Sequence, residues 1–146
     1  MLAAPTAIFI GMDSRSRRLR LADLVADHPD LRLVGHAPVD RSCLRATIAR
    51  RPDVLVLAPM AGRGGEAGQL VAGVRRGSPS TAILAIAAEE DRPVADPAGE
   101  ATADRVLADP ASLDQVMRAV LDLARARQVM ETPAARRDVR RRPPPS

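Results

Sequence analysis

The sequence predicts an α/β protein built as a (βα)5 unit around a parallel sheet. Five short apolar runs recur along the chain at a mean spacing of roughly 25 residues, and a helix-like stretch follows each of them. Chemistry in such sheets lies at the carboxyl ends of the strands, so these ends are where a site is expected. The predicted strands are Ala7–Gly11, Leu31–Gly35, Val54–Ala58, Ala82–Ala87 and Arg105–Ala108.

The first predicted strand leads into a helix through a loop that contains Asp13 and Ser14. We expect this helix to end near Pro29, because proline cannot donate the backbone hydrogen bond that would continue it. Apolar residues at helical spacing form the stripe that should face the sheet. These residues are Leu21, Leu24 and Val25.

The next two strands differ in pattern and therefore in expected position. Leu31–Gly35 alternates enough to be an edge strand with one wet face, whereas Val54–Ala58 is apolar throughout, as a buried central strand should be. Between them, Asp40 is a plausible N-cap, because its carboxylate can accept the first free N–H groups of a helix. Leu44 and Ile48 are expected to face inward from that helix.

The helices on either side of Ala82–Ala87 are predicted with unequal strength. The earlier one follows a flexible loop at Gly62–Gly65, and its apolar face consists of Leu70, Val71 and Val74. The later stretch, residues 89–104, has no apolar stripe and is interrupted by Pro93 and Pro97. A fourth helix there should be short or irregular.

The last helix has the clearest signal. Ser112 and Gln115 form a capping-box pattern at its start. Beyond residue 130 the chain is rich in Arg and Pro, so we expect a folded domain over residues 1–130 and a disordered tail over residues 131–146. The apolar face of the helix consists of Leu113, Val116, Met117, Val120, Leu121 and Ala124.

Composition excludes several classes of function. All 22 basic residues are Arg, so no mechanism that needs a lysine is available. Phe9 is the only aromatic residue, which removes stacking platforms for single-stranded nucleic acid. Cys43 is the only cysteine, so neither a disulfide framework nor a cysteine metal site is expected. The sequence shows neither a signal-peptide pattern nor an apolar run of about 18 residues, and the cytoplasm is the expected location.

The net charge of +4 is concentrated in the tail. Residues 131–146 hold five Arg against Glu131 and Asp138, a net charge of +3, which leaves +1 for residues 1–130. The globular part therefore gives no strong case for nucleic acid, and only the tail supports that hypothesis. A further cluster at the start of the first helix is expected to be a solvated face, formed by Arg15, Arg17, Arg18 and Arg20.

Five segments occur in an order and spacing that resemble a bacterial response-regulator receiver domain. They are Ala7–Asp13, Pro29–Gly35, Arg51–Leu57, Pro79–Leu84 and Val106–Asp109. The resemblance runs from residue 6 to about residue 128. It implies a flavodoxin-like, doubly wound parallel sheet with strand order 2-1-3-4-5 and a place in two-component signal transduction.

The resemblance also implies five site positions, and most of them lack a reactive group in this chain. In receivers, two acids bind Mg²⁺, an Asp accepts the phosphoryl group, and a hydroxyl and a Lys hold its oxygens. Only the second acid is present, as Asp13. The first acid, the phosphoacceptor, the hydroxyl and the Lys are replaced by Met12, Ala58, Ala87 and Ala108.

These replacements predict a pseudo-receiver, with the receiver fold but without phosphorelay chemistry. Asp109 lies one residue beyond the lysine position and cannot replace a cation. Asp13 alone would be a weak Mg²⁺ ligand, and we interpret it as an N-cap or turn acid. The Gly62–Gly65 loop could bind an anion at a helix N-terminus, although it lacks the lysine of a P-loop. We expect no catalytic residue, metal or cofactor, and no enzyme activity.

We therefore expect a signalling protein that is independent of phosphorylation and acts by protein–protein contact. Since the last helix is well formed and the fourth is weak, its outward side is the expected partner surface, with a homodimer as one form of it. The residues concerned are Arg118, Asp122 and Arg125. Two alternatives stay open: a module that binds a small ligand in the emptied pocket, and a nucleic-acid adaptor that acts through the basic tail.

Overall fold

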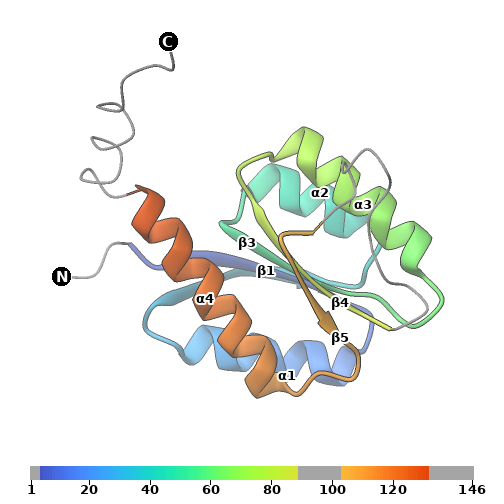
Figure 1. Cartoon of the computed structure of the whole chain (residues 1–146), viewed down its shortest axis with the longest axis horizontal. Helices are drawn as coiled ribbons and strands as arrows, with labels where there is room; N and C mark the ends of the chain where they lie inside the picture. Colours follow the sequence, from blue (N-terminus) through green and yellow to red (C-terminus); the bar gives the residue numbers. More distant parts are fainter. Residues whose placement is uncertain (1–3, 89–102, 132–146) are drawn as a thin grey trace, which may run out of the picture.

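The computed structural model describes residues 4–88 and 103–131, which form a parallel sheet with helices on both faces (Figure 1). The strand order is β2-β1-β3-β4-β5, and every neighbouring pair is parallel. The predicted doubly wound sheet and its order are therefore confirmed. The strands are β1 (Thr6–Met12), β2 (Leu31–Ala37), β3 (Val54–Ala58), β4 (Ala82–Ala87) and β5 (Arg105–Ala108).

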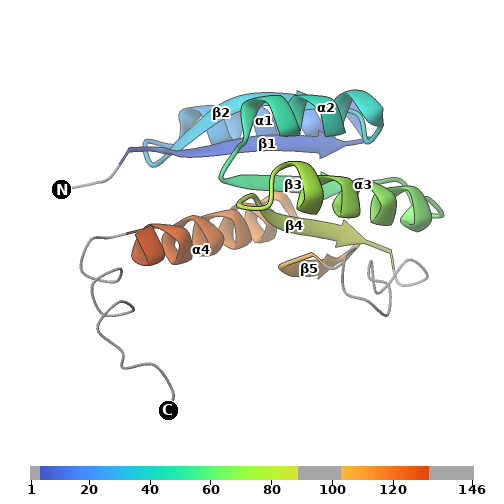
Figure 2. The same ribbon diagram turned by 90° about the horizontal axis from the view of Figure 1, so that it is seen from above.

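Four helices of the described residues cover this sheet in two layers, which lie above and below it in Figure 1; Figure 2 looks down through them. The last predicted helix is the element labelled α4. Residues 89–102 of the predicted weak helix and residues 132–146 of the predicted tail lie outside the described residues. Within the described ranges, no helix is both long and apolar enough to cross a membrane. The helices are α1 (Arg15–Asp27), α2 (Arg41–Arg50), α3 (Gly64–Gly77) and α4 (Leu113–Glu131).

Alternation along the strands divides the core between the two faces of the sheet. Ile8 and Ile10 pack with α1 and α4, whereas Phe9 packs with α2 and α3. Each such side chain contributes roughly 1.5–3 kcal/mol when it is fully buried. The predicted stripe of α1 is wrong at Leu24, which is 41% exposed. Leu21 and Val25 are fully buried, and at 100° per residue Leu24 falls on the flank of the face they form.

Small residues let α2 approach both β1 and α3. A Cβ on Gly11 would lie 2.6 Å from the Sγ of Cys43, which is fully buried, and burial raises the pKa of that thiol to about 12. Leu44 and Ile48 are only half-buried, because they lie against Gly73 and Gly77 of α3 rather than against the sheet. The α2 residues buried against the sheet are Cys43 and Thr47.

The predicted helix caps at Asp40 and Ser112 are confirmed. The Asp40 carboxylate accepts hydrogen bonds from the backbone N–H groups of Ser42 and Cys43 at 2.9 and 3.2 Å. Its pKa is lowered, chiefly by the hydrogen bond from the Ser42 hydroxyl. At α4, the N–H of Gln115 donates to the Ser112 hydroxyl at 3.1 Å, and the N–H of Ser112 donates to the Gln115 side chain at 2.8 Å. Both caps are local in sequence, which makes them predictable.

Candidate functional site

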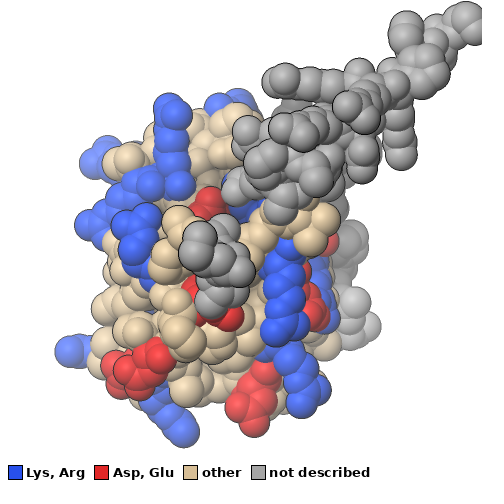
Figure 3. Space-filling model, turned by 90° about the vertical axis from the view of Figure 1, so that its left-hand side faces the viewer, with Lys and Arg blue, Asp and Glu red and all other residues tan. Residues whose placement is uncertain are grey.

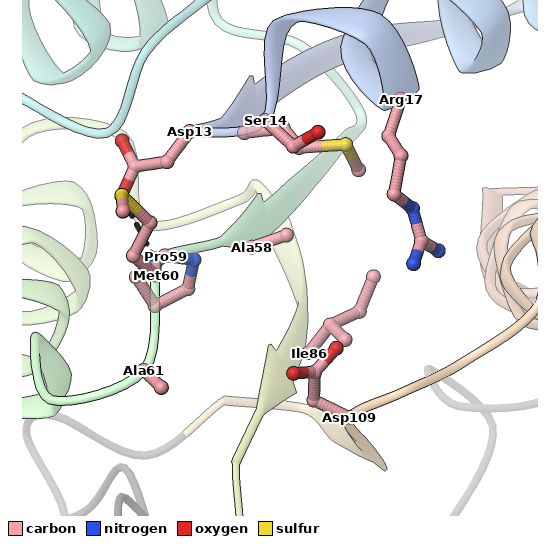
Figure 4. A pocket seen from close by; sticks show the side chains of 10 residues that line it. Asp13, Ser14, Arg17, Ala58, Pro59, Met60, Ala61, Ile86 and Asp109 are labelled. Atoms are coloured by element: carbon pink, nitrogen blue, oxygen red, sulfur yellow. Dashed lines mark hydrogen bonds between the residues drawn. The ribbon is translucent and has the colours of Figure 1, made fainter.

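A pocket of about 250 Å³ opens at the carboxyl ends of β1, β3 and β4. Ala58 and Ile86 contribute apolar surface to it, and the exposed side chain of Met60 lies at its margin. Figure 4 shows Asp13 on one side of the pocket and Arg17 on the other. This is the edge of the sheet where the sequence predicts a site.

The predicted positions reach this pocket only in part. Met12, Asp13 and Ala58 line it, whereas Ala87 and Ala108 do not. Ala87 faces the α2–α3 layer, because side chains alternate along β4. Ala108 is exposed at the end of the edge strand β5. Two neighbouring residues, Ile86 and Asp109, line the pocket instead.

Asp13 is a structural acid that ties two loops to the end of β1. Its side chain is 6% exposed. One carboxylate oxygen accepts from the N–H of Val39 at 3.0 Å, and the other accepts from the N–H of Met60 at 2.8 Å and from Arg63 at 2.6 Å. The N-cap of α1 is Ser14, so the N-cap interpretation of Asp13 is wrong. Its hydrogen bonds hold the β2–α2 and β3–α3 loops together.

Arg63 supplies the positive charge beside Asp13. The same guanidinium donates to Glu66 at 2.6 Å and to the carbonyl of Val39 at 2.8 Å. The hydrogen bond to Glu66, followed by the one to Asp13, raises the pKa of Arg63. Its loop is more ordered than the sequence predicts, since α3 already begins at Gly64. The sequence gives no signal for this contact, because 50 residues separate its two partners.

The residues present do not fit the Mg²⁺ ion that receivers use. Mg²⁺ takes six oxygen ligands in a strict octahedron, of which the protein usually supplies one or two carboxylates. Here both oxygens of Asp13 already accept hydrogen bonds, and the Arg63 guanidinium that contacts this carboxylate would repel a metal cation. Among the described residues, no three His, Cys, Asp or Glu side chains are grouped so that they could hold an ion.

Arg17 and Arg18 turn inward, contrary to the solvated face predicted for them. The Arg17 guanidinium donates to the carbonyl of Ala111, just before α4, and lines the pocket (Figure 4). Arg18 donates to the carbonyl of Met12 at 2.7 Å. Only Arg15 and Arg20 are exposed as expected. The inward pair uses positive charge to satisfy backbone carbonyls around the site.

Solved structures of signalling proteins share the fold of this chain over nearly their full length. The signal receiver domain of NarL from Mycobacterium tuberculosis is 23% identical, with a TM-score of 0.68 over 84% of this chain and 98% of that one. The response regulator domain of CheB from Thermotoga maritima is 20% identical, with a TM-score of 0.64 over 88% of this chain and 98% of that one. The chain has the receiver-domain fold.

The likeness extends to a receiver-fold structure solved with another protein bound. A complex of the phosphorylated P1 domain of CheA3 with CheY6 from R. sphaeroides contains a chain that is 20% identical, with a TM-score of 0.59 over 84% of this chain and 99% of that one. No protein-family model and no curated protein sequence matches the chain. The receiver fold predicted from the five segments is confirmed by structure alone.

Proposed function

We propose that this chain is a pseudo-receiver, a response-regulator-like signalling protein that binds a protein partner and does not accept a phosphoryl group. The observation that carries this proposal is the state of the strand ends. Ala58 stands at the end of β3, where a receiver has its phosphoacceptor, and the remaining acid, Asp13, is held by Arg63.

The chemistry of phosphoryl transfer supports the proposal that this chain does not accept a phosphoryl group. A nucleophile must attack phosphorus, and a cation must neutralise the charge that develops on its oxygens. The methyl group of Ala58 cannot attack. The Asp109 carboxylate lines the pocket, but it lies outside the phosphoacceptor position, and the cation that lines the pocket with it, Arg17, donates to the carbonyl of Ala111. At the receiver positions themselves, the strand ends therefore offer neither a nucleophile, at Ala58, nor a lysine, at Ala108.

The fold and the surface of α4 support the proposal that this chain binds a protein partner. CheY6 is seen in a complex with the P1 domain of CheA3, and this contact serves as the precedent. Val116 and Val120 bury one side of α4 on the sheet, which leaves Arg118 and Arg125 exposed on the other. Asp122 is also on the exposed side, where it pairs with Arg105 at 3.0 Å. This outward side of α4 is the proposed partner surface.

Charge reversal tests that surface. Arg118→Glu combined with Arg125→Glu should abolish capture of the partner from the native host, while the fold survives, because exposed substitutions usually cost under about 0.5 kcal/mol. Arg15→Glu combined with Arg20→Glu changes the charge equally on α1 and should leave capture intact. Equal capture by both variants would refute the α4 assignment. Sedimentation of the same proteins identifies the case in which the partner is a second copy.

The pocket at the strand ends is small for the alternative function, in which the protein binds a small ligand there. Pockets that bind drug-sized molecules have volumes of about 300–1,000 Å³. The pocket at the strand ends is smaller, at about 250 Å³. A thermal-shift screen distinguishes the two hypotheses, since a ligand that binds the native state raises its melting temperature. We expect no small molecule to do so.

A further inference from the structure

Arginine side chains gather at one end of the α2–α3 layer, near the amino ends of the strands. In Figure 3, which faces this end of the molecule, they form a group at the upper left, on the α2 side of the sheet. Five exposed arginines from β2, α2 and α3 make up this group, which we call the basic face. They are Arg32, Arg45, Arg50, Arg51 and Arg76.

Strand register and helix contacts place these residues close together. Arg32 pairs with Ala7 and so lies on the same face of the sheet as Phe9, the α2–α3 side. Arg50 reaches back to β2, where it donates to the carbonyl of Val34. The end of α3 joins the group because Gly77, the neighbour of Arg76, lies against Ile48 of α2. Residues from three elements therefore share one surface.

Few acids accompany this charge along the chain. Residues 31–52 contain five Arg and a single acid, Asp40, whose carboxylate caps α2. Within the described part of the chain, none of the five arginines of the basic face forms an ion pair. Residues 13–30, by contrast, contain four Arg and four Asp. The near-neutral total of the folded part thus hides a strong segregation of charge between the two layers.

Helix stability accounts for only part of the basic face. Cations near a helix C-terminus interact favourably with its dipole, which is sufficient for Arg50 and Arg76. It does not account for Arg32, which is on a strand, or for Arg45, which is in the middle of α2. An arginine at position 51 is unfavourable for stability, because the backbone there is left-handed at φ 45° and ψ 61°, a conformation that favours glycine. Position 51 therefore carries a guanidinium although a glycine would suit its backbone better.

We propose that the basic face binds the phosphate backbone of double-stranded nucleic acid without reading its sequence. Arginine suits this ligand, because its planar guanidinium pairs with two phosphate oxygens at once. Single strands are disfavoured, since the face has no aromatic side chain on which bases could stack. The proposal is independent of the α4 surface, which lies on the opposite face of the sheet.

The lack of an apolar anchor favours nucleic acid over an acidic protein. Protein interfaces concentrate their binding energy in a few buried aromatic or apolar side chains, surrounded by a polar rim. The large apolar side chains exposed in the described residues are all elsewhere, on α1, beside the pocket and on α4. They are Leu19, Leu24, Met60 and Val129. The basic face offers charge alone, which is what a phosphate backbone requires.

Fluorescence anisotropy with the full-length chain and a labelled mixed-sequence DNA duplex tests this proposal over a series of salt concentrations. The wild type should bind two unrelated duplexes equally. Arg45→Ala with Arg76→Ala should lower the slope of log affinity against log salt by about 2, since each phosphate contact contributes roughly 0.9. Arg15→Ala with Arg20→Ala removes the same charge from α1 and should leave the slope near the wild-type value. Circular dichroism confirms that each variant is folded.

Three outcomes would overturn the proposal. An equal loss in the basic-face and α1 variants would mean that only net charge matters. Binding that is lost on replacing Arg140, Arg141 and Arg142 with Ala in the full chain, and kept in the basic-face variant, would assign it to the tail. Preference of the face for an acidic polypeptide over the duplex at equal salt would identify a protein ligand instead.

Discussion

The carboxyl end of the parallel sheet and the basic face near its amino end use their charged side chains in opposite ways. At the carboxyl end, Asp13 and Arg63 pair with each other, and Arg17 and Arg18 bind backbone carbonyls. At the amino end, the arginines of the basic face are exposed and form no ion pair within the described residues, although the acids just before β3 and β5 are paired. At the end where parallel sheets usually carry chemistry, these charged side chains are therefore taken up by internal contacts, whereas the arginines of the basic face stay exposed.

The buried polar groups near the basic face do not depend on its arginines, whereas those at the carboxyl end of the sheet depend on a charged side chain. At the amino end, the hydroxyls of Ser78 and Thr81 are buried, 2.7 Å apart, and Thr81 donates to the carbonyl of Pro52. This network is satisfied without the arginines above it. At the carboxyl end, the loops depend on the carboxylate of Asp13 itself. Substitutions of Asp13 and of the basic-face arginines should accordingly affect stability very differently.

The largest effect is expected at Asp13. Asp13→Ala leaves the N–H groups of Val39 and Met60 and the guanidinium of Arg63 without their acceptor. Each unsatisfied group costs about 1–3 kcal/mol, and solvent can replace part of the loss at the half-exposed Arg63, so we expect a decrease of roughly 2–4 kcal/mol in the free energy of unfolding. Urea denaturation measures it. Asp23→Ala, at an exposed position on α1, is the matched control, and an equal loss in both variants would contradict the role given to Asp13.

A smaller effect is expected at Asp40, where the carboxylate caps only one helix. Asp40→Ala should lower the free energy of unfolding by about 1 kcal/mol at neutral pH. Because the pKa of Asp40 is lowered in the folded state, this carboxylate stabilises the fold above its ordinary pKa, and the effect is lost as the pH falls through the lowered value. Denaturation curves of the wild type and the alanine variant should therefore converge in acid. Asp40→Asn has a cap that does not titrate, so the difference in stability between this variant and Asp40→Ala should not disappear in acid.

The smallest effect has the opposite sign and occurs at Arg51. Glycine relieves a left-handed backbone that costs about 1–2 kcal/mol, but it adds roughly 0.5–1 kcal/mol of entropy to the unfolded chain. Arg51→Gly should therefore stabilise the protein by about 0.5 kcal/mol while it weakens duplex binding. Arg76→Gly should weaken binding too, but should destabilise α3 by about 1 kcal/mol. If Arg51→Gly lowers the free energy of unfolding as Arg76→Gly does, the left-handed backbone at Arg51 does not destabilise the protein, and this interpretation is wrong.

Local patterns predicted the strands and the caps of this protein well. The apolar runs fix β3, β4 and β5 at their observed bounds, since a buried parallel strand has to be apolar. The caps at Asp40 and Ser112 depend on contacts within three residues. The order of the strands came from the resemblance to receivers, because periodicity alone does not specify how strands are arranged.

Contacts between distant segments were not predictable in this way. Asp13 and Arg63 are 50 residues apart, and Arg17 and Ala111 are 94 residues apart, so no local pattern links them. Summed charge was also misleading, since the +1 of residues 1–130 conceals a balanced segment, residues 13–30, and an unbalanced one, residues 31–52. The pairing of charges and their placement on a surface emerge only when the chain is folded.

The central claim, that the carboxyl end of the sheet takes up no phosphoryl group, is tested most directly by intact-mass analysis. The full chain is incubated with acetyl phosphate and Mg²⁺, beside a receiver with a complete site as a positive control for the donor. We predict that the mass of this chain stays unchanged while that of the control increases. An acid-labile gain of about 80 Da, the mass of one phosphoryl group, on a peptide that contains Asp13, Asp109 or residues 53–60 would contradict it.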